Sequence, residues 1–184
     1  MTYYGPKEMA ASFRTVRGNT IKIAEEIPEK SYSYRAAPDC RSVAEALIHI
    51  ATSTRLPHQI HITERRDTMA GFDFPSFLEK QKAEEKAPRT KAEILKMLQE
   101  EGEKFAQALE GLSEAFLAQR VQFPQGMEPP SKTRFEMLLG PKEHEMHHRG
   151  QLMVVQRMLG MVPPLTRQME ERIAAMKTAS AGAA

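Results

Sequence analysis

The sequence predicts an all-α fold: a four-helix bundle with a long crossover connection and a short extra helix at the C-terminal end. Two observations carry this prediction. Four long segments repeat apolar residues at helical spacings of three and four, and three of these segments begin with a capping box. No segment shows the sustained alternation and turn residues of a β-strand. Amphipathic helices of this kind bury their apolar stripes against one another in a bundle.

The first two helices each have one clear boundary signal in the sequence. The first ends at Pro28 and carries the apolar stripe Met9, Phe13, Val16, Thr20, Ile23 and Ile27. The second begins at the capping box of Ser42 and Glu45. Pro57 is expected to kink the second helix, and the helical pattern continues for about a turn beyond it.

A long crossover connection follows, from Asp67 to Pro88, with a short helix expected at about 76–85. Its glycine and prolines surround three phenylalanines, which are Phe72, Phe74 and Phe77. A crossover of this kind could form part of a pocket wall at one end of the bundle. The third helix begins at the capping box of Thr90 and Glu93, and its apolar stripe, which runs to Phe116, is the most regular in the chain.

The fourth helix follows a proline-rich loop at 123–130 and starts at the capping box of Thr133 and Glu136. It runs to Gly160 and is ended by the prolines at 163 and 164. Another amphipathic helix is expected over 165–176, and the small residues of 178–184 are expected to be frayed. We therefore expect one domain over residues 1–177.

The composition restricts the class of function. Hydrophobic residues make up 41% and charged residues 27%, which is ordinary for a globular domain. A net charge of +2 without a basic cluster does not indicate a nucleic-acid partner. No apolar run is long enough for a membrane span, and residues 1–18 lack a secretory leader, so we expect a cytoplasmic protein. The single Cys40 allows neither an internal disulfide nor a cysteine-based zinc site.

Two histidines of the fourth helix lie where core residues are expected. His144 and His148 are within about 40° of each other around a helix, in the stripe that would otherwise face a hydrophobic core. An unpaired buried imidazole is costly, whereas two imidazoles one turn apart can chelate a divalent cation. The alternative is a pair of core histidines bonded to backbone carbonyls, and a bare H-x-x-x-H pattern favours that alternative.

His49 is the third candidate ligand, because it lies beside the apolar side of the second helix among small neighbours. If the second and fourth helices are neighbours, His49, His144 and His148 supply three nitrogens. Three imidazoles with an open fourth position suit zinc, and nickel or iron(II) are chemically possible. Gln151 could hydrogen-bond a ligand imidazole. The other histidines are assigned to packing or surface roles: His58, His61 and His147.

These motifs resemble the DinB superfamily. The resemblance lies in the helix of 42–50, the H-x-x-x-H-R-G-Q string of 144–151 and the proline-ended segment 159–164, and covers about residues 5–165. It implies a four-helix bundle, frequent homodimers, and a divalent metal on His49, His144 and His148. Thiol-dependent members use bacillithiol, mycothiol or glutathione. The implied function is a metal-dependent S-transferase with a low-molecular-weight thiol co-substrate, or a hydrolase or isomerase of small electrophiles.

Two other functions stay open. His144 to His148 formally matches H-E-x-x-H, the zinc peptidase motif in which Glu145 would be the general base. The metzincin extension would need a glycine at 151 and a histidine at 154, where this chain has Gln151 and Val154. The third class is a non-catalytic, stress-linked metal-binding or dimerisation module. Since no carboxylate is clearly placed as a general acid or base, no catalytic residue is assigned.

Overall fold

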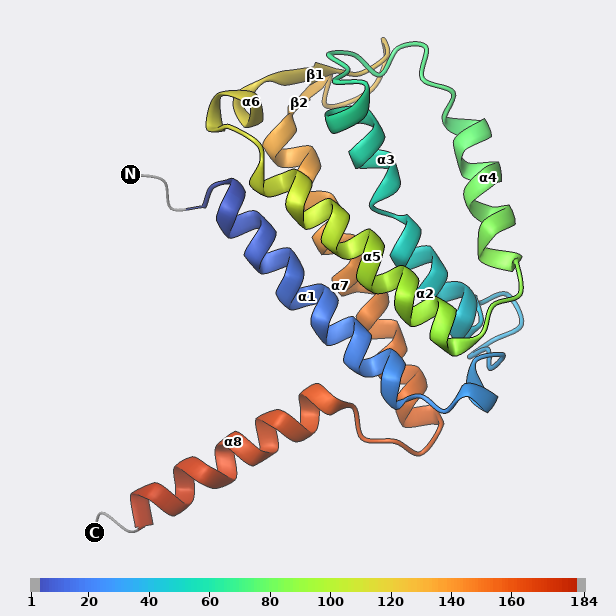
Figure 1. The fold of residues 1–184 in the computed structure, drawn as a ribbon, viewed down its shortest axis with the longest axis vertical. Coiled ribbons are helices and arrows are strands. Elements are labelled where there is room, and N and C mark those ends of the chain that lie inside the picture. The colour runs from blue at the N-terminus through green and yellow to red at the C-terminus, as the bar shows by residue number, and fades with distance from the viewer. Residues whose placement is uncertain (1–3, 182–184) are drawn as a thin grey trace.

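The computed structural model describes residues 4–181, and its main body is a bundle of four long helices (Figure 1). These helices are α1 (Pro6–Glu26), α2 (Val43–Thr52), α5 (Lys91–Glu110) and α7 (Arg134–Met158). Helices α1 and α2 each pack against both α5 and α7. Helix α2 is therefore a neighbour of α7, which is the condition for His49 to face His144 and His148. The all-α four-helix bundle predicted from the sequence is confirmed.

The capping boxes set the starts of three of these helices. The hydroxyl oxygens of Ser42, Thr90 and Thr133 each accept the backbone N–H three residues later, at 3.2, 3.3 and 3.1 Å. In return, the glutamate at that later position accepts the backbone N–H of the cap residue. Two N–H groups that the helix cannot pair are therefore satisfied at each start.

Further elements connect the bundle helices. Beyond α2 the chain continues through α3 (Arg55–His58) into a π-helical turn (Gln59–Thr63), and the crossover carries α4 (Phe74–Lys86), which packs on α2. After α6 (Glu114–Ala118), strands β1 (Arg120–Gln122) and β2 (Ser131–Thr133) pair antiparallel, Val121 opposite Lys132. The sequence prediction lacked these strands, because three residues are too few to show alternation.

The expected C-terminal helix is present and longer than predicted. Helix α8 (Pro164–Ala181) has 18 residues, beyond the expected 165–176, and extends away from the bundle (Figure 1). Residues 178–181 of the expected tail continue this helix, since alanine favours helix even where the apolar stripe has ended. Residues 182–184 lie outside the described part of the chain.

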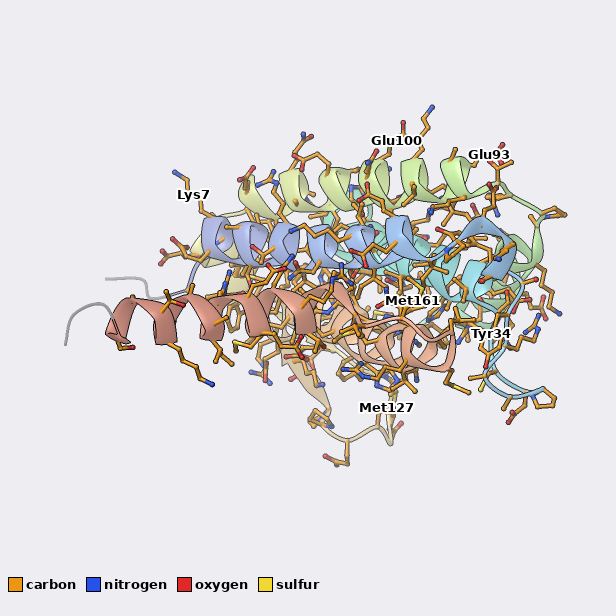
Figure 2. All side chains as sticks on the ribbon, turned by 90° about the horizontal axis from the view of Figure 1, so that it is seen from below. Lys7, Tyr34, Glu93, Glu100, Met127 and Met161 are labelled. Carbon is orange, nitrogen blue, oxygen red and sulfur yellow. The ribbon has the colours of Figure 1, made fainter. Side chains whose placement is uncertain are left out.

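Side chains are sorted by polarity around the bundle. Lys7, Glu93 and Glu100 are exposed and point outward from α1 and α5 (Figure 2). Inside, apolar residues form two clusters, one around Ile23, Leu47 and Leu98 and the other around Phe13 and Phe105. Among the helices of 4–181, none is both long and apolar enough to cross a membrane.

One buried ion pair joins all four bundle helices. The Nε of Arg17, on α1, donates to both carboxylate oxygens of Glu145, on α7, at 3.0 Å. Its two other nitrogens donate to the carbonyls of Leu98 on α5, at 2.7 Å, and Ile50 on α2, at 3.2 Å. Arg17 is 4% exposed and Glu145 is fully buried, so neither charge has water as an alternative partner.

The guanidinium also needs space on α5, and Gly102 provides it. A Cβ atom at position 102 would lie 2.8 Å from Cγ of Arg17, closer than real contacts allow. The glycine therefore lets the arginine side chain pass between α1 and α5. Its cost in helix propensity is offset by the four hydrogen bonds that the guanidinium makes.

We expect Arg17→Met to lower the free energy of unfolding by about 3–5 kcal/mol, because it leaves Glu145 buried and unpaired. The double variant Arg17→Met, Glu145→Leu should recover most of this loss, since neither charge remains. Urea unfolding followed by circular dichroism measures both. Arg14→Met is the matched control, because Arg14 lies on the same helix and pairs with exposed Glu103 and Glu110. Equal losses for Arg17→Met and Arg14→Met would contradict the assigned role of the buried pair.

Candidate metal centre

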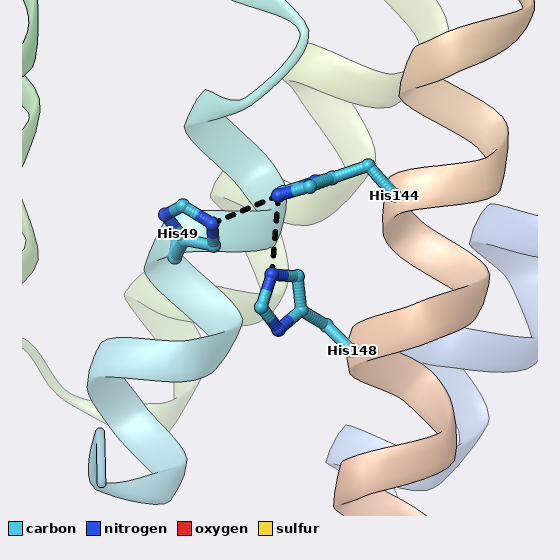
Figure 3. A group of neighbouring side chains, drawn as sticks. All are labelled: His49, His144 and His148. Atoms are coloured by element: carbon cyan, nitrogen blue, oxygen red, sulfur yellow. Dashed lines mark hydrogen bonds between the residues drawn. The ribbon is translucent and has the colours of Figure 1, made fainter. Parts of the chain in front are cut away.

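Three imidazole nitrogens converge between α2 and α7 (Figure 3). The Nε2 atom of His144 lies 3.1 Å from Nε2 of His49 and 3.1 Å from Nε2 of His148. One nitrogen from each ring falls within 4.8 Å of the other two. His144 and His148 occupy successive turns of α7, and His49 faces them from α2. The structure thus brings together the three residues that the sequence analysis named as candidate ligands.

The His49 ring is oriented by a carboxylate from the crossover. Its Nδ1 lies 2.7 Å from Oε1 of Glu85, and because a carboxylate only accepts, Nδ1 carries the proton. Glu85 is 7% exposed, and its other oxygen accepts from Nε of Arg41 at 2.7 Å. Burial alone would raise the pKa of Glu85, but the hydrogen bonds from His49 and Arg41 outweigh burial and lower it. In the neutral His49 ring, Nε2 then presents a lone pair to the other histidines.

Gln151 orients His148 in the same way. Its side-chain oxygen lies 2.9 Å from Nδ1 of His148, and its amide nitrogen lies 3.1 Å from Nε2 of His147. With the amide donating to His147, its oxygen accepts the Nδ1 proton of His148. The Nε2 atom of His148 is left with its lone pair toward the converging group. This is the position in which the sequence analysis placed Gln151, next to a candidate ligand.

His144 lies between the other two rings. Its Nδ1 is buried and has no hydrogen-bond partner among residues 4–181. Burial, followed by the positive charge that neighbouring histidines would carry, lowers the pKa of His144 to about 4. Burial also lowers the pKa of His148, against the opposing hydrogen bond to Gln151. At neutral pH both rings are therefore uncharged, the form in which imidazole binds a metal.

The donor set fits a divalent metal. Ligands about 2.0–2.1 Å from a tetrahedral zinc are roughly 3.3 Å apart, close to the 3.1 Å separations of this group. Two of the three rings have their protons held on Nδ1 by Glu85 and Gln151. Lone pairs that face one another repel unless a proton or a cation lies between them. A carboxylate hydrogen-bonded to the far nitrogen of an imidazole, as Glu85 is to His49, is a common support for a metal-binding histidine.

Glu145, the general base of the peptidase alternative, lies on another side of α7. Its two oxygens accept hydrogen bonds from Arg17, and the residue is fully buried in the bundle. It therefore cannot take a proton from a group bound at His144 and His148. In this chain the two histidines of the H-E-x-x-H motif are candidate metal ligands, whereas its glutamate belongs to the buried ion pair with Arg17.

The remaining histidines stay outside the converging group. His61 is buried with its Nδ1 3.1 Å from Nη1 of Arg134, and Nδ1 of half-buried His58 lies 3.4 Å from the Thr63 hydroxyl. His147 is exposed and contacts Gln151. These positions agree with the packing and surface roles expected from the sequence.

Glu85 and Arg41 were missed by the sequence analysis. Glu85 belongs to the segment 82–86, in which every residue except Ala83 is charged, a composition typical of an exposed helix face. Its spacing from His49 carries no signal, because the two residues are 36 positions apart and belong to different helices. Only the packing of α4 across α2 identifies it as a partner of His49.

Two cavities of different character flank the three histidines. The first, of about 870 Å³, contains His148 and the basic side chains of Arg35, Arg41, Lys82 and Lys86. The second, of about 380 Å³, contains His49 and His144 and is walled by apolar residues of α3, α4 and α7. A centre between them is accessible from both sides.

Solved structures that share this fold include two proteins from Bacillus subtilis. The DinB-like protein YjoA from Bacillus subtilis is 25% identical, with a TM-score of 0.62 over 84% of this chain and 94% of that one. YfiT from Bacillus subtilis, described as a probable metal-dependent hydrolase with an unusual four-helix bundle topology, is 16% identical, with a TM-score of 0.66 over 88% of this chain and 91% of that one. No curated protein matches the sequence. The model of the DinB family matches residues 1–177, and the chain belongs to this family.

Proposed function

We propose that this protein is a metal-dependent enzyme in which His49, His144 and His148 hold a divalent ion, with zinc or nickel as first choices. The observation that carries the proposal is the convergence of three Nε2 atoms, two of them on rings whose protons are fixed elsewhere. Three protein ligands leave a fourth position open, which is the arrangement of catalytic rather than structural sites.

We propose that the open position activates a small thiol for transfer to an electrophilic substrate. A divalent metal at such a site lowers the pKa of a thiol, ordinarily near 8.5, and so favours the nucleophilic thiolate at neutral pH. In this chain Glu85 and Gln151 keep the rings of His49 and His148 oriented. Transfer from a thiol also suits a site in which Glu145 cannot act as a base.

Two lysines of the larger cavity, which is lined by charges of both signs, support a thiol that carries anionic groups. Bacillithiol and glutathione, which the resemblance implies as co-substrates, both contain carboxylates. Arg41 already neutralises Glu85, and Arg35 pairs with Glu45, but Lys82 and Lys86 line the same cavity without a carboxylate partner among the described residues. These two ammonium groups are free to pair with a carboxylate of a bound thiol.

Hydrolysis of a small electrophile is the second candidate, and the description of YfiT as a probable metal-dependent hydrolase favours it. The same three histidines would serve, with water in place of the thiol. We further propose that the protein is cytoplasmic and homodimeric, as the family resemblance implies, and that residues 1–177 act as one domain.

Replacing any one of His49, His144 or His148 with alanine should weaken zinc binding at least about 100-fold, because each supplies one of three nitrogens. Glu85→Gln should weaken it by about 10–100-fold, since it removes the carboxylate that orients His49. Competition against a chromogenic chelator measures these affinities. His147→Ala is the matched control on α7 and should bind zinc as the unaltered protein does. Normal zinc affinity in His49→Ala would refute the three-histidine assignment.

The thiol proposal can be tested with cobalt(II) bound in place of zinc. Addition of glutathione or bacillithiol should produce sulfur-to-cobalt charge-transfer absorption, because the thiolate would enter the open position. Cys40→Ser should give the same spectrum, which separates the added thiol from the protein's own cysteine. His148→Ala should give none. If neither thiol changes the spectrum but the zinc protein hydrolyses small esters, the hydrolase candidate replaces the transferase. If no thiol binds and no ester is hydrolysed, the non-catalytic alternative holds.

A further inference from the structure

The smaller cavity beside the histidines has an apolar wall. It is lined by Leu56 and Ile60 beyond α2, Phe74 and Leu78 of α4, and Met137 of α7. Its volume of about 380 Å³ falls at the lower end of the roughly 300–1,000 Å³ of small-molecule sites. Because His49 and His144 form part of the same wall, a molecule in this cavity would contact the candidate metal centre directly.

No aspartate, glutamate, lysine or arginine lines this cavity within the described chain, whereas the larger cavities contain several of each sign. Two of its polar residues are already engaged with neighbours. The Ser53 hydroxyl donates to the carbonyl of Ile50 at 2.8 Å, and the Gln81 amide donates to the Thr52 hydroxyl at 3.2 Å. The cavity therefore offers apolar contact and no charge to an occupant.

His61 also lines this cavity without adding charge. Its Nδ1 lies 3.1 Å from Nη1 of Arg134, and because a guanidinium only donates, Nδ1 accepts and the proton is on Nε2. Burial, together with the positive charge of Arg134, lowers the pKa of His61 to about 4. The imidazole is consequently neutral at physiological pH.

Irregular backbone is concentrated on the same wall. Pro57 and Pro141 both line the cavity, and each removes one N–H from its helix. The π-helical turn of Gln59–Thr63 brings both Ile60 and His61 to the cavity. Such departures from regular helix recur at functional sites, which is a second observation independent of the side-chain chemistry.

We propose that this cavity binds the apolar body of a small, uncharged substrate, an alkyl or aryl compound whose reacting group faces His49 and His144. The reacting group's role rests on the proposed function, but the binding of the apolar body does not. A neutral, apolar body fits because a charged one would lose its hydration without gaining a partner of opposite charge.

A glycine in the cavity wall makes the proposal testable. Gly140 lines the cavity, and a Cβ atom there would have no atom within 4 Å. Gly140→Leu should therefore place its side chain in the cavity without meeting a residue of another element. Gly150 is the matched control: it lies on the same helix, is exposed, has the same open surroundings and lines none of the cavities described above.

The experiment is a titration of the full chain, as purified, with 4-fluoroacetophenone, a neutral aryl ketone, followed by ¹⁹F NMR. We expect Gly140→Leu to weaken binding at least ~10-fold, because the added isobutyl group occupies the apolar space, and Gly150→Leu to leave it unchanged. The cation 4-fluorobenzylammonium, of similar shape, should bind this cavity at least ~10-fold more weakly than the ketone, because no described residue of the wall offers it a carboxylate.

The proposal is overturned if the ketone does not bind, if Gly140→Leu binds it as the unaltered chain does, or if the ammonium compound binds more strongly and its binding is lost in Gly140→Leu. Zinc affinity of the same variants separates this inference from the proposed function. Zinc binding without ketone binding refutes the cavity alone. Ketone binding that responds to Gly140→Leu in a chain that binds no zinc supports the cavity and refutes the metal centre.

Discussion

The buried pair of Arg17 and Glu145 fixes how α7 lies in the bundle. Glu145 must face α1 to meet the guanidinium, and adjacent residues on a helix point about 100° apart. With Glu145 directed to the interior, His144 is turned toward α2, and His148 follows one turn later. The guanidinium also donates hydrogen bonds to the backbone carbonyls of Ile50 and Leu98, so the same side chain ties α2 and α5 to α1. The arrangement of the candidate ligands thus depends on a charge pair that takes no part in their chemistry.

The crossover helix α4 contributes to both sides of the site. Its C-terminal half supplies Glu85, which holds the proton of His49 on Nδ1 and leaves Nε2 available. Its N-terminal half supplies Phe74 and Leu78, which wall the apolar cavity. Of the three phenylalanines expected to wall a pocket there, only Phe74 lies beside the histidines; Phe72 and Phe77 line a separate, more polar cavity. One connection between bundle helices therefore both orients a candidate ligand and limits what can approach it.

Local signals predicted most of the fold. Capping boxes at Ser42, Thr90 and Thr133 marked three helix starts, and helical phase placed His144 and His148 on one side of α7. What escaped prediction depends on contacts between distant segments. Arg17 interrupts an apolar stripe, and its partner Glu145 is 128 positions away. Glu85 belongs to a mostly charged segment that is typical of exposed helix. The local sequence around Arg17 or Glu85 does not reveal the partner of either residue, because these contacts form only when the helices pack.

We propose that His49, His144 and His148 together hold one divalent ion. X-ray absorption at the metal edge of the zinc-loaded protein can test this, because imidazole rings give a characteristic multiple-scattering signal. We expect three imidazole nitrogens at about 2.0–2.1 Å from the zinc and one further light-atom ligand from solvent. A shell with fewer than three imidazoles, or one with sulfur from Cys40, would contradict it.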